Sequence, residues 1–199
     1  MRKGGASVGG GVQNGRMPEL IRPLERVHRS FVAAMEEFRA EGRGAADDHS
    51  MVGSEIRTHS ARWAEPAAFA EFVAALKADA AEETLRPVGY VPGTTLWYVE
   101  GDEYLGRLAI RHRLTPNLLE VGGHIGYDVR PSARRRGHAT AMLKAALPLA
   151  YELGIESALV TCDEDNIASA KVILNNGGMY EDSRSGKRRY WIATSGVGL

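Results

Sequence analysis

The chain has 199 residues, of which 44% are hydrophobic and 25% are charged, and its formal net charge at neutral pH is zero. This length and composition are typical of one soluble domain with a full core. Zero net charge argues against a general nucleic-acid binder. The one cysteine excludes an internal disulfide framework and fits a reducing compartment such as the cytoplasm. No apolar run approaches the roughly 18 residues that indicate a membrane span.

The start of the chain differs in composition from the remainder. Residues 1–16 are glycine-rich, contain almost no large apolar side chains and lack the hydrophobic stretch of a secretory signal. We interpret them as a flexible leader or a remnant of expression, and we expect residues 17–199 to form a single domain.

Helical spacing of apolar side chains predicts two helices in the first half of the chain. A short strand at residues 19–22 leads to Pro23, which suits the first position of a helix ending near residue 40. Pro66 begins a second helix that runs to about residue 81. Residues 43–62 between them are polar, and their acidic and histidine side chains lack metal-ligand spacing. We therefore predict a solvated loop there and no metal site.

Branched and aromatic residues predict a β-meander after the second helix. Residues 94–100 and 104–113 form a hairpin, and residues 119–129 form the third strand. The period of two along a strand then places Glu120 and His124 on the same face.

A basic loop follows the third strand and opens directly into an amphipathic helix at residues 139–153. Its core is Arg134-Arg135-Arg136-Gly137-His138-Ala139. Unpaired N–H groups at a helix start favour a phosphate, and glycine lets a ligand approach the backbone. The fingerprints of a nucleoside-triphosphate P-loop and of a dinucleotide-binding turn are both absent.

The last part of the chain reads as a βαβ unit and a hairpin. Residues 157–162 form a buried strand that the preceding helix joins to the third strand, so the two strands should be parallel. Asn166 leads a shorter helix at residues 167–176. Residues 179–182 and 187–193 close the chain as a hairpin.

The loop Arg134-x-x-Gly137-x-Ala139 in this strand–loop–helix setting resembles the pyrophosphate loop of the GNAT superfamily of acyl-CoA-dependent N-acyltransferases. The predicted order β-α-α-β-β-β-α-β-α-β-β also resembles that family across residues 19–193. The resemblance implies an α/β fold with a mixed, mostly antiparallel central sheet, in which one parallel pair of strands splays apart.

The same resemblance implies which residues bind acetyl-CoA, the expected co-substrate. Pantetheine would pair with the backbone of the third strand, and the loop would hold the diphosphate. Asn166 and Ser169 would contact the cofactor from the following helix. The expected cofactor-binding residues are Asp128, Val129, Arg130, Arg134, Arg135, Arg136, Gly137, His138, Ala139, Thr140, Asn166 and Ser169.

The catalytic groups are less clearly indicated. The family often has a tyrosine that protonates the leaving thiolate, but Ile173 stands at that position. Either Tyr127, Tyr180 or Tyr190 serves instead, or the thiolate leaves without a dedicated acid. Glu120 and His124 are candidate bases for the attacking amine. His112 is a third candidate, and Cys162 reads as a small buried hydrophobe rather than an acyl carrier.

These features predict a cytoplasmic N-acetyltransferase in which a primary amine attacks the thioester directly. The sequence leaves open whether the amine belongs to a small molecule or a peptide, and whether the protein is a homodimer. A non-catalytic acyl-CoA-binding domain is one alternative. A nucleic-acid surface built from the arginines of residues 130–136 and 184–189 is another, which zero net charge disfavours.

Overall fold

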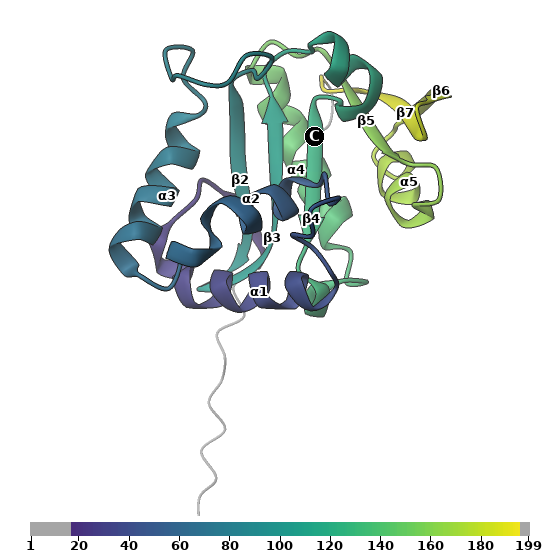
Figure 1. The fold of residues 1–199 in the computed structure, drawn as a ribbon. Coiled ribbons are helices and arrows are strands. Elements are labelled where there is room, and N and C mark those ends of the chain that lie inside the picture. Colours follow the sequence, from purple (N-terminus) through teal and green to yellow (C-terminus); the bar gives the residue numbers. More distant parts are fainter. Residues whose placement is uncertain (1–16, 196–199) are drawn as a thin grey trace, which may run out of the picture.

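A computed structural model describes residues 17–195, so the expected leader at residues 1–16 lies outside the described part (Figure 1). Seven strands form one sheet in the order β1-β2-β3-β4-β5-β7-β6. Only β4 and β5 are parallel within this sheet. The mixed, mostly antiparallel fold is therefore confirmed. The strands are β1 Glu19–Ile21, β2 Gly93–Glu100, β3 Glu103–Arg111, β4 Ile125–Val129, β5 Ser157–Asp163, β6 Met179–Arg184 and β7 Lys187–Ala193.

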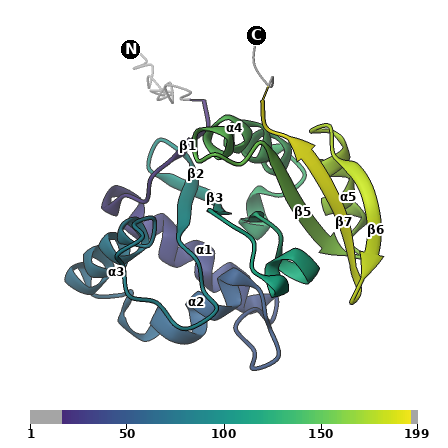
Figure 2. The same ribbon diagram turned by 90° about the horizontal axis from the view of Figure 1, so that it is seen from above.

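Five α-helices cover the two faces of the sheet and give the molecule two hydrophobic cores (Figure 2). Alternation along β2 supplies both cores, because Leu96 and Tyr98 belong to one cluster while Trp97 and Val99 belong to the other. The first three helices pack in the Trp97 cluster and the last two in the Leu96 cluster. The helices are α1 His28–Ala40, α2 Met51–His59, α3 Pro66–Ala78, α4 His138–Glu152 and α5 Ile167–Leu174.

Helix α2 lies inside the segment for which the sequence predicted a polar loop, so that prediction is wrong. The Oγ of Ser50 accepts a hydrogen bond from the backbone N–H of Gly53 at 3.0 Å and caps the helix. Val52 and Ile56 are buried one turn apart. A pattern with so few apolar residues gives a weak periodic signal, and tertiary packing decides the structure.

The third strand of the meander is shorter than predicted. Residues Leu118–Gly122 form a helical turn, η3, and β4 begins at Ile125. Gly123 has a φ of 64°, and a Cβ there would lie 2.6 Å from the carbonyl oxygen of Leu159. Since only glycine fits this approach, the chain turns here. Glu120 therefore does not share a strand face with His124, contrary to the prediction.

Strands β4 and β5 separate almost as soon as they meet. Among the described residues they share one paired position, Ile125 with Val160. The carbonyl of His124 accepts from Arg111, and the N–H of Arg130 donates to Leu105, both at 2.8 Å. Alternation along an antiparallel ladder then points the backbone groups of Tyr127 and Val129 away from β3, into the gap beside β5.

His124 closes the narrow end of this gap. Its backbone N–H donates to the carbonyl of Leu159 at 2.7 Å, and its Nδ1 accepts from the N–H of Leu159 at 3.0 Å. Burial, with a smaller contribution from the Arg111 charge, lowers the pKa of His124 to about 4. The ring is therefore neutral at pH 7, with its proton on Nε2.

The stability of the protein should consequently depend on His124 at mildly acidic pH. The unfolded histidine takes up a proton near pH 6.5, whereas the folded one does so only near pH 4. The free energy of unfolding should fall as the pH drops through this window. Urea denaturation at pH 7, 6 and 5 measures the effect. His124→Asn keeps an acceptor without a titrating ring, so the difference in stability between wild type and variant should shrink with falling pH. A constant difference would contradict this role.

Candidate functional site

The basic loop forms an open anion site at the start of α4. The backbone passes through left-handed conformations at Arg135 (φ 62°) and Gly137 (φ 82°) before the helix begins at His138. The N–H groups of His138, Ala139 and Thr140 donate to no backbone carbonyl of the described residues, as expected at a helix start. A Cβ on Gly137 would meet nothing within 4 Å. An anion can therefore approach these amides and the positive end of the helix dipole.

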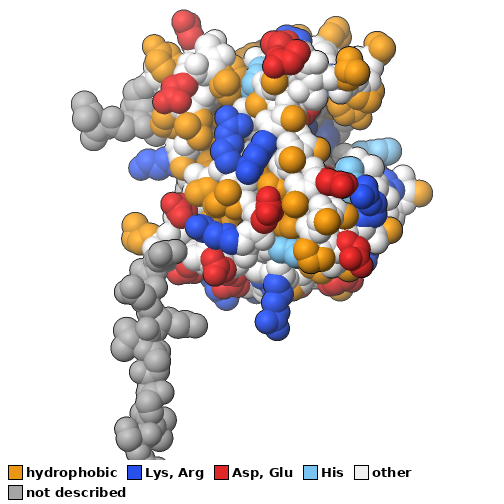
Figure 3. Space-filling model, turned by 90° about the vertical axis from the view of Figure 1, so that its left-hand side faces the viewer, with side chains coloured by type: hydrophobic (Ala, Val, Ile, Leu, Met, Phe, Trp, Pro, Cys, Tyr) orange, Lys and Arg blue, Asp and Glu red, His pale blue; other side chains and the backbone are white. Residues whose placement is uncertain are grey.

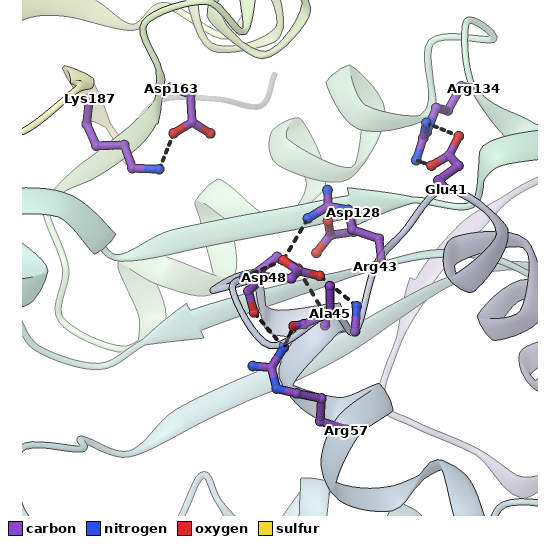
Figure 4. Close-up of polar contacts among 12 residues, drawn as sticks. Glu41, Arg43, Ala45, Asp48, Arg57, Asp128, Arg134, Asp163 and Lys187 are labelled. Atoms are coloured by element: carbon purple, nitrogen blue, oxygen red, sulfur yellow. Dashed lines mark hydrogen bonds and ion pairs between the residues drawn. The ribbon is translucent and has the colours of Figure 1, made fainter.

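The arginines of this region divide into two kinds. The Nη2 of Arg130 lies 2.7 Å from Glu37. Arg134 forms a bidentate pair with Glu41 at 2.8 and 2.7 Å (Figure 4). These two side chains fasten the loop to α1. Arg135 and Arg136 are exposed and form no ion pair with any of residues 17–195. Their charges are the ones available to an incoming anion.

The α5 side of the gap carries a chain of hydroxyl groups. The Oη of Tyr127 lies 2.8 Å from the Oγ of Ser169, and the N–H of Ser169 donates to Oδ1 of Asn166 at 3.0 Å. Asn166 is thus the N-cap of α5. Burial raises the pKa of Tyr127 and also that of the neighbouring Cys162. Both groups are therefore protonated at pH 7.

Ile173 lies one turn after Ser169 and is fully buried in the core. Tyr127 from β4 places its hydroxyl near the turn of α5 that precedes this position. Tyr180 and Tyr190 lie elsewhere. They line a cavity of about 470 Å³ together with Glu164, Ser183 and Arg188, on the far side of β5 from the gap.

The opposite face of β4 presents charged side chains to α2. Asp128 is paired in register with Arg107 of β3, so both side chains lie on this face. Arg107 makes a close ion pair with Glu55 of α2. The Nη2 of Arg43 lies 3.5 Å from Asp128 (Figure 4). Glu55, Arg107 and Arg43 were not anticipated from the sequence, because their proximity depends on the unpredicted helix α2.

The candidate bases lie apart from one another. Glu120 is at the surface, where it accepts from Ser185 at 3.3 Å and lies 3.7 Å from Arg184. The ring of His112 is hydrogen-bonded to Thr94 at 2.9 Å, and burial lowers its pKa. His112 follows β3 and is held toward β2, on the side of β3 that faces away from β4 and the gap.

His138 and Thr140 connect the loop to its surroundings. The His138 ring packs 5.5 Å from Tyr98, and its pKa is lowered first by burial and then by Arg136. The carbonyl of Thr140 accepts from Asn176 at 3.3 Å.

Residues 17–195 contain no cluster of histidine, cysteine and acidic side chains suited to a metal ion. No helix in this range is long and apolar enough to cross a membrane. On the face that Figure 3 shows, acidic and basic side chains are interspersed with hydrophobic ones, without a large field of one sign.

Comparison with known structures shows the same fold. MccE, a microcin C7 self-immunity acetyltransferase solved with acetyl-CoA and AMP, is 13% identical, with a TM-score of 0.58 and 92% and 94% of the two chains covered. RimJ of Mycobacterium smegmatis, solved with a CoA disulfide, is 15% identical, with a TM-score of 0.60 and 88% and 81% covered. RimL, a ribosomal L7/L12 α-N-protein acetyltransferase solved with coenzyme A, is 17% identical, with a TM-score of 0.58 and 92% and 96% covered.

No curated protein matches the chain by sequence. The model of the GNAT acetyltransferase domain, however, matches residues 31–179, which is more than half of the chain. This range includes the gap between β4 and β5, the basic loop and α5. The chain therefore belongs to the GNAT family of acyl-CoA-dependent N-acetyltransferases.

Proposed function

We propose that the protein transfers an acetyl group from acetyl-CoA to a primary amine by direct attack in a ternary complex. The observation that carries the proposal is the geometry of β4, whose free edge leads straight to the uncapped start of α4. An extended ligand with amides binds a strand edge, and its diphosphate needs a helix start. MccE and RimL, solved with acetyl-CoA and coenzyme A, support this co-substrate.

The residues of the gap fit such a ligand. The carbonyl of Val129 accepts from Nε of Arg134 at 3.1 Å, which leaves the N–H of Val129 and both backbone groups of Tyr127 for the pantetheine amides. Asp128, also expected to bind it, directs its backbone groups to β3. The N–H of Arg130 likewise donates to β3, whereas its carbonyl accepts from the N–H of Ala133 at 2.9 Å. The amides of His138, Ala139 and Thr140, with Arg135 and Arg136, would hold the diphosphate.

The reaction needs positioning more than reactive protein groups. A neutral amine attacks the carbonyl carbon, and the thiolate leaves while a proton is lost from nitrogen. Tyr127, supported by Ser169, would protonate the leaving sulfur in place of the absent family tyrosine. His124 is poorly suited as the base, because Nδ1 is occupied and Nε2 already carries a proton. Glu120 is solvated at the surface.

For the acceptor we propose a chemical class, and for the cellular setting a compartment. MccE and RimL are described as acting in microcin immunity and on a ribosomal protein, so we propose an amine on a small molecule or a peptide. A cytoplasmic enzyme fits the one cysteine, Cys162. We propose neither a nucleic-acid nor a membrane partner, and a homodimer is compatible with this function.

The direct test is coenzyme A release from acetyl-CoA in the presence of a panel of primary amines and peptide N-termini. We expect turnover with at least one acceptor class and none without an amine. Tight binding of acetyl-CoA without turnover on any acceptor would favour the non-catalytic acyl-CoA-binding domain instead.

Gly137→Asp should weaken acetyl-CoA binding by roughly 100-fold, since it places a carboxylate where the diphosphate should lie. Gly89→Asp is the matched control, because Gly89 also has a positive φ (88°) and open space around a Cβ. Isothermal titration with acetyl-CoA should show the loss in the first variant alone. Equal affinities for the two variants would exclude the α4 start as the phosphate site.

Tyr127→Phe should lower kcat by roughly 100-fold while the KM for acetyl-CoA stays nearly constant, because the hydroxyl acts on the leaving group. Ser169→Ala should have a smaller effect in the same direction. Steady-state kinetics with saturating amine separate the two constants. An unchanged kcat in Tyr127→Phe would mean that the thiolate leaves without help from this residue.

A further inference from the structure

Asp128 lies in β4, the strand that borders the gap, and its carboxylate has unused capacity to accept hydrogen bonds. Its side chain is 11% exposed, and its nearest cation is Arg43, at 3.5 Å. The carboxylate accepts no hydrogen bond from any of residues 17–195. A nearly buried carboxylate is costly unless donors satisfy it, so this group is suited to a donor that comes from outside the chain.

The other acidic groups on this face of the sheet already have donors. Asp48 accepts from the N–H groups of Gly44 and Ser50, both at 2.9 Å, and its pKa is lowered to about 2. Glu55 is paired closely with Arg107. Further along the same face, Glu37 and Glu41 are held by Arg130 and Arg134. Asp128 therefore differs from its acidic neighbours.

Asp128 and Tyr127 are neighbours in β4, the strand along which the thioester is proposed to lie. Tyr127 contacts Ser169 on the α5 side of the sheet, whereas Asp128 faces Arg43 and Arg107 on the α2 side. Successive side chains of a strand point to opposite faces. A thioester lying along this edge would have a proton donor on one side and a carboxylate on the other.

We propose that Asp128 accepts the proton of the attacking amine, an inference that depends on the acetyl transfer proposed above. The amine nitrogen forms a bond to the acetyl carbon, and the carbon–sulfur bond breaks with its electron pair going to sulfur. The nitrogen loses one proton to the Asp128 carboxylate, and Tyr127 gives one to the thiolate. Exchange with solvent then restores both side chains.

The charges around Asp128 keep it usable as a base. Three positive charges favour the carboxylate form: Arg107 from β3, Arg43 from the α1–α2 loop and Arg134 from the basic loop. The negative charges of Asp48 and Glu55 oppose it. The hydroxyl groups of Tyr104 and Tyr127 are neutral, because their pKa values are raised. Burial is the largest influence and raises the pKa of Asp128 above its ordinary value. A carboxylate with a raised pKa is a stronger base for an amine.

The test compares Asp128→Asn with wild type across pH. We expect kcat/KM for the amine to fall by roughly 10²- to 10⁴-fold, the acidic limb of its pH profile to disappear, and acetyl-CoA affinity to stay within about twofold. Asp79→Asn makes the same substitution at a more exposed aspartate, which lies beside Arg86 near the start of β2. It should leave all three quantities unaltered.

Arg43→Gln provides a second measurement that keeps the proposal testable if Asp128→Asn folds poorly. Removing this positive charge should move the acidic limb to higher pH, because the Asp128 carboxylate loses stabilisation. A purely structural role would not move that limb.

The outcomes separate the two proposals. Suppose that wild type turns over, but the acidic limb of the pH profile is retained in Asp128→Asn or does not shift in Arg43→Gln. Either result would overturn the role of Asp128 and leave acetyl transfer standing. Loss of the limb in Glu120→Gln would assign the base to Glu120. Absence of turnover by wild type on every amine would overturn acetyl transfer and the role of Asp128 with it.

Discussion

The site depends on one parallel strand pair that forms and then stops. Ile125 and Val160 pair, and His124 completes the contact by using its imidazole as an acceptor for the N–H of Leu159. Beyond this point the backbone of β4 has donors and acceptors that β5 does not satisfy. Unpaired backbone groups are costly when buried and can pair with another extended chain when open. The proposed pantetheine would pair with them along this edge.

The surroundings hold this edge in place rather than close it. Arg130 and Arg134 extend from the end of β4 and the basic loop to Glu37 on α1 and to Glu41, the C-cap of α1. These contacts neutralise two of the charges that a simple count would assign to phosphate. They also fix the loop that aims the N–H groups of α4. The loop thus combines internally paired arginines, which position the backbone, with exposed ones, which are available to a ligand.

The two faces of β4 differ in chemical character. The α5 face offers hydroxyl groups that stay protonated, and the α2 face offers a carboxylate among arginines. Acetyl transfer needs a proton to leave nitrogen and another to reach sulfur. In the proposed mechanism, Asp128 would accept the proton from nitrogen and Tyr127 would give one to sulfur. As adjacent residues of one strand, they direct their side chains to opposite faces of the sheet.

Sequence reasoning predicted the parts of the molecule that depend on neighbouring residues. The basic loop, the Asn166 cap, the βαβ unit and both hairpins each have their signal within a short stretch, and the structure confirms these elements. Helix α2 was missed because its stability comes from packing. The turn at Gly123 was missed because it depends on the close approach of the Leu159 carbonyl, which is distant in sequence.

The site was predicted unevenly for the same reason. Some contacts of the site follow from the topology and not from local spacing. Arg134 is paired with Glu41, 93 residues away, and Asp128 faces Arg107 and Arg43. The alternation of side chains along a strand predicted that Glu120 and His124 share a face. That prediction assumed a continuous strand, which the helical turn at Leu118–Gly122 interrupts. Arrangements within one continuous segment, such as the basic loop before α4 and the Asn166 cap of α5, follow from the sequence. Contacts between distant segments do not.

The most direct measurement of the central claim is a crystal structure of the protein with acetyl-CoA. The account predicts pantetheine amides hydrogen-bonded to the backbone of Tyr127 and Val129, with the diphosphate over the N–H groups of His138, Ala139 and Thr140. A ligand bound in the cavity beside Tyr180 with the gap left vacant, or strands β4 and β5 paired along their length, would contradict it.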